Sequence, residues 1–160
     1  MPQDYLDYQR ARFHTHLPRG CRFTSEHYWL RPLEAATHRW QVGFTSYAIR
    51  LLGDLVEHEW SVQPGAPITL GMKLGWLDGF KAATDLVAVI SGTFERGNPE
   101  LQRNLDLLTH DCFGAGWLYE ACGEPDQTTL NVDDYAHLLN GLIDTAWARQ
   151  LRQQSEQACQ

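Results

Sequence analysis

The stretch that decides the fold is LGWLDGFKAATDLVAVI at residues 74–90. Its two apolar runs, Leu74–Asp78 and Leu86–Ile90, are too short for helices, and a polar turn separates them. This pattern predicts a β-hairpin. Lys81 lies near the expected tip, and Lys73 is the only other lysine of the chain. A lysine displayed on such a turn is suited to carry a covalently tethered group.

Short apolar runs broken by glycine and proline continue on both sides of the hairpin, from Cys21 to about Gly123. Runs of this length and flanking composition are typical of short strands. The further candidates are Tyr28–Arg31, Trp40–Phe44, Leu55–Trp60 and Trp117–Cys122. The chain is therefore expected to be mainly β, with helices at its periphery.

Two short helices are expected among these strands. Thr45 is a candidate N-cap for a helix that ends at Leu52, with Gly53 as its stop. The apolar face of this helix is expected to comprise Ala48, Leu51 and Leu52. The second helix is expected from Pro99, because proline is favoured at a first helical position, to about Thr109.

The end of the chain carries the strongest helical signal. Asn131 is a candidate cap, and Asp133 and Asp134 suit the positive end of the helix dipole. Apolar residues recur there at helical spacing, at Val132, Tyr135, Leu139, Leu142, Ile143 and Trp147. We expect residues 126–160 to form a C-terminal helix packed on the β body.

Residues 1–20 are polar, contain several aromatic residues and show no clear period. We expect an arm or a short helix outside the core, ended by Pro18 and Gly20. His14 and His16 form a close histidine pair. In a polar arm such a pair is expected to be solvated rather than to bind a metal.

The composition limits the classes of function. The chain has 160 residues, of which 43% are hydrophobic and 21% charged, and a net charge of −7. This is the balance of one globular domain, and the negative charge argues against nucleic acid or an anionic membrane as the main partner. Because no apolar run approaches the ~20 residues of a membrane span and residues 1–20 lack the features of a secretory signal, a cytoplasmic location is expected.

The sequence also lacks the motifs of several enzyme classes. The four cysteines, Cys21, Cys112, Cys122 and Cys159, include no C-x-x-C pair and are expected to be free, partly buried thiols. A glycine-rich phosphate loop and the G-x-S-x-G nucleophile motif are missing as well. The chain is therefore not expected to be an enzyme with a catalytic centre of its own.

Five motifs in order resemble the H protein family of the glycine cleavage system, whose members carry lipoic acid on one lysine. They are SEHYWLR (25–31), VGFT…YA…LLGD (42–54), KAATD…SG (81–92), NPEL (98–101) and GAGWL (114–118). Spacing extends the resemblance, because the family keeps a glycine sixteen residues before its modified lysine and another eleven after it. Gly65 and Gly92 stand at these offsets from Lys81.

The resemblance implies a lipoyl-carrier fold over residues 21–125, a β barrel-sandwich of two small antiparallel sheets with peripheral helices. It also implies that lipoate is the cofactor and is attached to Lys81, with no metal involved. Gly65, Asp78 and Gly92 would be recognised by the enzyme that attaches it. The family's E-S-V before the lysine is D-G-F here, so that enzyme must accept a glycine and a bulky phenylalanine.

One departure from the family affects the cleft that holds the amine carried by the lipoyl arm. The second glutamate of the family's E-H-E-W motif is Tyr28 in this chain. Asp85, another cleft residue of the family, is present, and Glu26 lies two residues before Tyr28. A carboxylate suits the cleft because it accepts charge-assisted hydrogen bonds from an ammonium group. Tyr28 is thus either a tolerated change in a working H protein or the sign of a different cargo.

The resemblance implies a carrier that takes an aminomethyl group from glycine decarboxylase to the aminomethyltransferase. A lipoate ligase or lipoyltransferase would modify it, and dihydrolipoamide dehydrogenase would reoxidise it. An alternative is an H-like lipoate-binding protein that carries sulfur intermediates for heterodisulfide-reductase-like proteins. A third hypothesis is a scaffold paralogue that is never lipoylated. Both carrier hypotheses require Lys81, whereas the scaffold does not.

Overall fold

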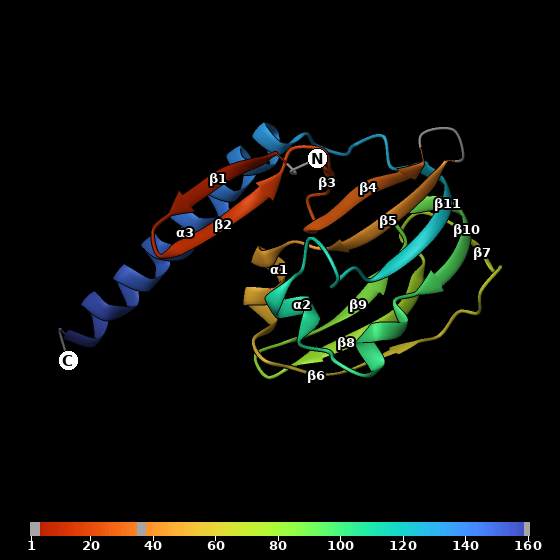
Figure 1. Cartoon of the computed structure of the whole chain (residues 1–160). Helices are drawn as coiled ribbons and strands as arrows, with labels where there is room; N and C mark the ends of the chain where they lie inside the picture. The colour runs from red at the N-terminus through yellow and green to blue at the C-terminus, as the bar shows by residue number, and fades with distance from the viewer. Residues whose placement is uncertain (1–3, 35–37, 159–160) are drawn as a thin grey trace.

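The structure, a computed structural model, describes residues 4–34 and 38–158. Its body is built from two antiparallel sheets that face each other (Figure 1). The strands of the larger sheet are β3 (Arg22–Phe23), β4 (Tyr28–Glu34), β5 (Arg39–Phe44), β11 (Tyr119–Pro125), β10 (Ile90–Gly97) and β7 (Pro67–Ile68), in this spatial order. Those of the smaller sheet are β6 (Leu55–Trp60), β8 (Lys73–Gly79) and β9 (Ala83–Val87), again in spatial order.

Side chains from both sheets fill the space between them. Leu74, Leu77 and Leu86 of the smaller sheet are fully buried, and so are Val42 and Ile90 of the larger one. Removal of this apolar surface from water is the main force that holds the sheets together. The arrangement confirms the predicted mainly β fold of two antiparallel sheets with peripheral helices.

The boundary between β9 and β10 differs from the prediction. Leu86–Ile90 was expected to be one strand, but β9 ends at Val87 and β10 begins at Ile90. Ala88 and Val89 between them are buried. The apolar run is therefore continuous because the chain passes through the core from one sheet to the other.

The first expected helix is present as α1 (Ser46–Leu52), which Gly53 ends with a φ of 75° that favours glycine. Its apolar face was predicted wrongly in one position: Ile49 is buried, whereas Leu51 is half exposed. The Thr45 side chain makes no cap hydrogen bond, because its hydroxyl is bonded to the Tyr135 hydroxyl 2.7 Å away.

The second expected helix, Pro99–Thr109, is two separate pieces. The first is a 3-10 turn, η1 (Pro99–Gln102), in which the Asn98 side chain accepts a hydrogen bond from the Glu100 amide. The second is α2 (Leu107–His110), a single helical turn. The helical spacing of the leucines was wrongly interpreted as one continuous helix. Each piece instead buries its own leucine in the body, Leu101 in the first and Leu108 in the second.

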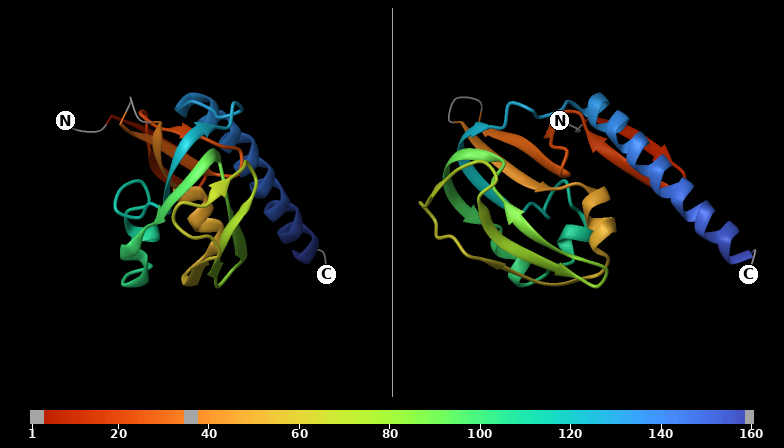
Figure 2. Two further views of the ribbon diagram at one scale, coloured as in Figure 1. Left: turned by 90° about the vertical axis from the view of Figure 1, so that its right-hand side faces the viewer. Right: turned by 180° about the vertical axis from the view of Figure 1, so that it is seen from behind.

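The two ends of the chain form a second packed unit, which we call the wing: β1 (Tyr5–Arg10), β2 (Phe13–Pro18) and α3 (Val132–Ala158). The two strands pair as a hairpin along α3, and the wing projects from the body on the side of α1 (Figures 1 and 2). The expected arm or short helix is therefore wrong for residues 4–20. Phe13, Thr15 and Leu17 point inward in strict alternation, and the threonine among them hid this pattern.

The expected C-terminal helix is confirmed, and Asn131 caps it by accepting a hydrogen bond from the Asp134 amide at 2.8 Å. It packs mainly on β1 and on the edge strand β3 rather than broadly on the body. Leu142 and Trp147 of the expected apolar stripe are partly exposed, at 37% and 42%. Within the described residues, no helix has an apolar stretch long enough to cross a membrane.

The cysteine predictions are partly confirmed. Cys21 and Cys112 are buried free thiols, and burial raises the pKa of both. Cys122 is half-buried in β11, and Cys159 lies outside the described residues.

Candidate functional site

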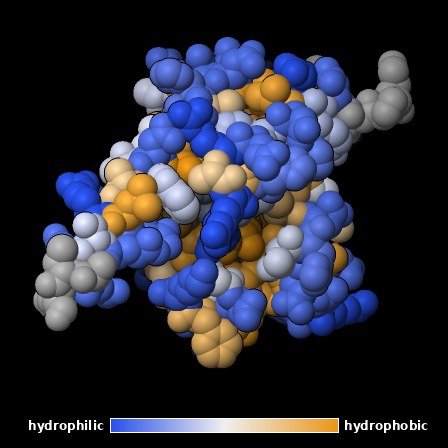
Figure 3. Space-filling model, turned by 90° about the vertical axis from the view of Figure 1, so that its left-hand side faces the viewer, coloured by the Kyte–Doolittle hydropathy of each residue, from blue (hydrophilic) through white to orange (hydrophobic). Residues whose placement is uncertain are grey.

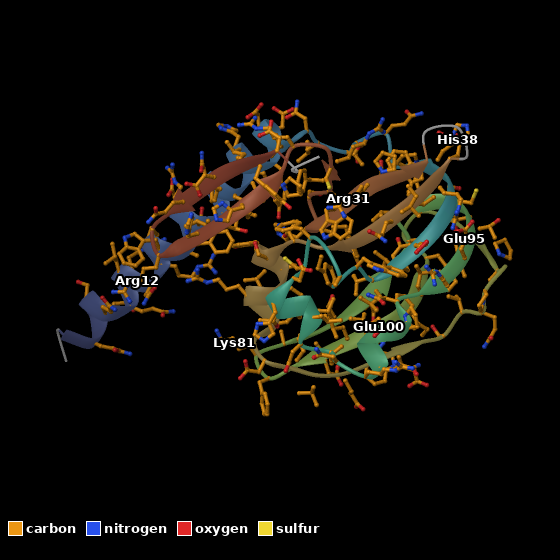
Figure 4. All side chains as sticks on the ribbon, viewed as in Figure 1. Arg12, Arg31, His38, Lys81, Glu95 and Glu100 are labelled. Atoms are coloured by element: carbon orange, nitrogen blue, oxygen red, sulfur yellow. The ribbon has the colours of Figure 1, made fainter. Side chains whose placement is uncertain are left out.

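The hairpin predicted from the sequence is formed by β8 and β9, which pair from Lys73↔Val87 to Asp78↔Ala83. The turn between them, residues 80–82, extends beyond the sheet at the end near α1, and the side chain of Lys81 is exposed there (Figure 4). Inward-facing leucines anchor both strands in the core. A rigid two-stranded base therefore presents Lys81 to solvent.

Backbone hydrogen bonds to the end of α1 fix this turn. The Lys81 amide donates to the Leu52 carbonyl at 3.0 Å, and the Phe80 amide donates to the Asp54 carbonyl at 2.8 Å. Across the turn, the Gly79 amide donates to the Ala82 carbonyl at 2.9 Å. The position of Lys81 is thus set by its backbone, and its side chain remains available.

Two glycines make this close junction possible. A Cβ atom at Gly79 would lie 2.2 Å from the Leu52 carbonyl oxygen, a distance that real atoms do not reach. A Cβ atom at Gly53 would lie 2.8 Å from Cγ of Lys81, so the lysine stem rests over this glycine. A serine at Gly79, as the family has there, would therefore require the hairpin or α1 of this chain to shift. Sequence reasoning had assigned Gly53 only as a helix stop.

The acidic residues near the hairpin line a separate cleft of about 690 Å³. Its charged lining consists of Glu26, Lys73, Asp78 and Asp85. Lys73 forms an ion pair of 3.3 Å with Asp85, so three carboxylates share the cleft with one ammonium group. The structure thus brings together the predicted cleft residues and Asp78, and adds Lys73, which the register of β8 opposite β9 places there.

Tyr28, the third predicted cleft residue, forms the inner wall of the cleft. It is only 2% exposed, and its ring stacks on Phe44 with ring centres 4.5 Å apart. Its hydroxyl accepts a hydrogen bond of 3.0 Å from the Val87 amide, and burial raises its pKa to about 12. Tyr28 is therefore a neutral structural residue of the cleft wall and does not replace the charge of a carboxylate.

Lys81 does not line this cleft. It lines a second hollow of about 310 Å³ along α1, together with Ser46, Ile49, Arg50, Gly53, Asp54 and Thr109. Figure 3 shows the face of the molecule on which α1 and the hairpin turn lie, with apolar side chains gathered in its middle and lower part among polar ones. An arm on Lys81 therefore starts outside the acidic cleft, beside α1.

Gly65 lies in the connection between β6 and β7, and Gly92 lies in β10 of the larger sheet. Both are away from the hairpin turn. Gly65 has a φ of 89°, and its amide donates to the Phe94 carbonyl at 2.7 Å. A Cβ atom at Gly92 would lie 2.0 Å from the Cys122 carbonyl oxygen in the neighbouring strand. Both glycines are thus required by the local backbone, and the structure does not bring them together with Lys81.

Comparison with known proteins agrees with this geometry. The glycine cleavage H-protein family model matches residues 21–140. The H protein of Mycobacterium leprae is 35% identical over 104 residues, covering 65% of this chain and 76% of the relative. That of Pseudoalteromonas translucida is 32% identical over 129 residues, covering 79% and 98%.

The solved structures give the same result. The crystal structure of a glycine cleavage system H protein from Mycobacterium marinum superposes with a TM-score of 0.68 at 30% identity, covering 78% of this chain and 99% of the other. The family match begins after the β1–β2 hairpin and ends within α3, so much of the wing lies outside it. The body carries the family's motifs and fold, and the chain belongs to the glycine cleavage H-protein family.

Proposed function

We propose that this chain carries lipoate on Lys81 and shuttles an aminomethyl group from glycine decarboxylase to the aminomethyltransferase. Members of its family are lipoyl carriers of glycine cleavage rather than catalysts. The observation that carries the assignment to Lys81 is the exposed side chain on a turn whose backbone α1 holds fixed. A carrier needs this combination, because the enzymes that modify and load the lysine must reach it in a defined position.

The surroundings of Lys81 fit a lipoyl group. Its stem lies over Gly53, where any side chain would displace it, and the adjoining hollow along α1 leaves room beside the amine. Lipoate, joined to the amine by an amide bond, supplies a disulfide that can accept and release a small group. Tethering keeps that group at a high effective concentration near each partner's site.

The charge of the cleft favours an aminomethyl cargo. Glu26, Asp78 and Asp85 outnumber Lys73 in its lining, and carboxylates accept charge-assisted hydrogen bonds from an ammonium group. The loss of the family's glutamate at Tyr28 therefore leaves the cleft acidic.

We also propose that Asp78, three residues before Lys81, is read directly by the lipoate ligase or lipoyltransferase. It ends the paired part of β8 and lies opposite Ala83 at the base of the turn. Gly65 and Gly92 would contribute through the backbone shape that they allow. The surroundings of Gly92 leave no place for a side chain, and the φ of Gly65 would be strained for any other residue.

The test is loading by the decarboxylase. The lipoylated chain is mixed with glycine decarboxylase and labelled bicarbonate, and exchange of the label into glycine is measured. We expect exchange with the wild type and with Lys73→Arg, the control that changes the other lysine, and none with Lys81→Arg. Lipoylated protein that supports no exchange would overturn the glycine cleavage role, whereas exchange with Lys81→Arg would overturn the attachment site.

A further inference from the structure

The outer face of the β1–β2 hairpin gathers three metal-ligating side chains that the carrier function does not use. In the register of the hairpin, Asp7 lies directly opposite His16, and His14 lies two residues away on the same strand as His16. All three are exposed, since the alternation of β2 turns Phe13, Thr15 and Leu17 inward and the two histidines outward. Directly opposed and diagonal positions of a strand pair are close enough for their side chains to meet.

The side chains converge on one point. The Asp7 Oδ1 atom lies 2.6 Å from His14 Nε2 and 3.3 Å from His16 Nδ1. The three ligand atoms all lie within 4.8 Å of one another. Ligand atoms about 2.05 Å from a tetrahedral zinc ion are roughly 3.3 Å from one another. Side-chain shifts of about an ångström would bring the three ligand atoms of Asp7, His14 and His16 to this spacing.

Side-chain contacts with α3 hold the first strand of the hairpin in place. The Tyr8 hydroxyl donates to the Asn140 side chain of α3 at 2.8 Å, and the Arg10 guanidinium forms a two-bonded ion pair with Asp144 of the same helix. Arg10 is thereby directed away from Asp7, and Arg19 pairs with Asp4. The carboxylate of Asp7 therefore faces the two histidines, and the strands that hold them are fixed by α3.

We propose that Asp7, His14 and His16 bind a divalent transition-metal ion. Two imidazoles and one carboxylate suit zinc, copper or nickel, whereas magnesium and calcium prefer oxygen ligands alone. Water completes the coordination, because the site lies on an open face. The ion replaces the hydrogen bond between Asp7 and His14 and joins the two strands of the hairpin. The sequence had argued against a metal at the histidine pair, since it did not show that a hairpin brings Asp7 to them.

Zinc binding by the full chain tests this proposal. Zinc chloride is titrated into metal-free Lys81→Arg protein by calorimetry, so that no lipoyl thiols compete. We expect one zinc ion per chain, with the affinity reduced at least ~10-fold by His16→Gln and by Asp7→Asn, because each change removes a ligand. The matched control is His38→Gln, which alters an exposed histidine that also lies beside a carboxylate, that of Glu124; it should bind like the parent.

A second measurement uses the stability of the fold. Zinc should raise the Tm of the parent and of His38→Gln, because it binds the folded hairpin, and raise that of His16→Gln by less at the same zinc concentration. The substituted side chains are exposed, so these variants retain the packing of the wing. Affinity that is equal in the parent and in both site variants would place the ion elsewhere, for example at a cysteine, and overturn the proposal. The absence of binding up to millimolar zinc would overturn it as well.

Discussion

The body and the wing of this protein are held together in different ways. The body encloses a large, mainly aliphatic core between two sheets. Backbone hydrogen bonds join its Lys81 turn to α1. The wing packs a smaller set of aromatic and aliphatic side chains between a hairpin and one helix, and Tyr135 connects it to the body. The ring of Tyr135 stacks on Phe23 at 4.7 Å, and its hydroxyl is bonded to Thr45 and to His27.

This difference corresponds to the division between the part of the chain that matches the family model and the part outside it. The family match covers the body and the beginning of α3, whereas the β1–β2 hairpin precedes it. Changes where the Lys81 turn meets α1 should therefore affect both stability and lipoylation. Changes elsewhere in the body and in the wing should affect stability alone.

The largest effect is expected at Gly79 in the body. Gly79→Ala places a Cβ atom 2.2 Å from the Leu52 carbonyl, so the hairpin or α1 must move. We expect a loss of about 3 kcal/mol in the free energy of unfolding, as for overpacking of a close contact, and slower lipoylation of Lys81. The wing control is Gly141→Ala, where a Cβ atom meets nothing within 4 Å and the helix gains about 0.5–1 kcal/mol. Urea denaturation and a lipoylation time course give both quantities, and an unchanged rate with Gly79→Ala would break the contrast.

The second effect is a pH dependence at the junction of the two regions. Burial lowers the pKa of His27 to about 4, whereas its ordinary value is 6.5. Between these values the unfolded chain binds more protons than the folded one, so the stability should fall as the pH drops from 6.5 to 4, by on the order of 2–3 kcal/mol. Unfolding by urea at a series of pH values measures this loss.

The variant for this prediction is His27→Asn, because His27 has a φ of 75° that asparagine tolerates. We expect it to remove most of the loss. For comparison, His58→Gln in β6 of the body should remove a part of the loss, because burial lowers the pKa of His58 as well. An equal pH dependence in wild type and His27→Asn would contradict the assignment.

The third effect concerns the wall of the cleft. Tyr28→Phe removes the hydroxyl that accepts the Val87 amide hydrogen bond and keeps the stacking on Phe44. We expect a loss of about 1 kcal/mol in the free energy of unfolding, because a partly buried N–H loses its partner. The charge of the cleft does not change, so lipoylation and loading should continue at wild-type rates. A large loss of loading in this variant would show that the hydroxyl acts on the cargo.

The smallest effect is expected in the wing, at the exposed ion pair of Arg10 and Asp144. Arg10→Gln should lower the free energy of unfolding only slightly, because solvent screens both charges. A salt titration of the Tm should show that this small difference vanishes at high ionic strength. A loss as large as that of Gly79→Ala would mean that the wing and the body fold as one tightly coupled unit.

The parts of the fold that are coded locally could be predicted from the sequence. The β8–β9 hairpin, α1 with its stop at Gly53, and the Asn131 cap each depend on residues that are neighbours in the chain. The β1–β2 hairpin was missed because its inward positions include Thr15, which is buried by tertiary packing rather than by its own hydrophobicity.

The candidate site shows the same limit. The sequence identified Lys81, Asp78, Asp85 and Glu26, but it could not show that Lys81 lies beside α1 while the acidic residues share a separate cleft. The close approach at Gly79 and the burial of Tyr28 depend on contacts between residues far apart in the chain. Such contacts leave no local pattern in the sequence.

The measurement that tests the central claim most directly is the intact mass of the protein after incubation with a lipoate ligase, ATP and lipoate. The account predicts that the wild type and Lys73→Arg each gain one lipoyl group and that Lys81→Arg gains none. If the wild type gains nothing with several ligases, or if Lys81→Arg is modified as well, then Lys81 is not the carrier residue and the fixed turn beside α1 serves another purpose.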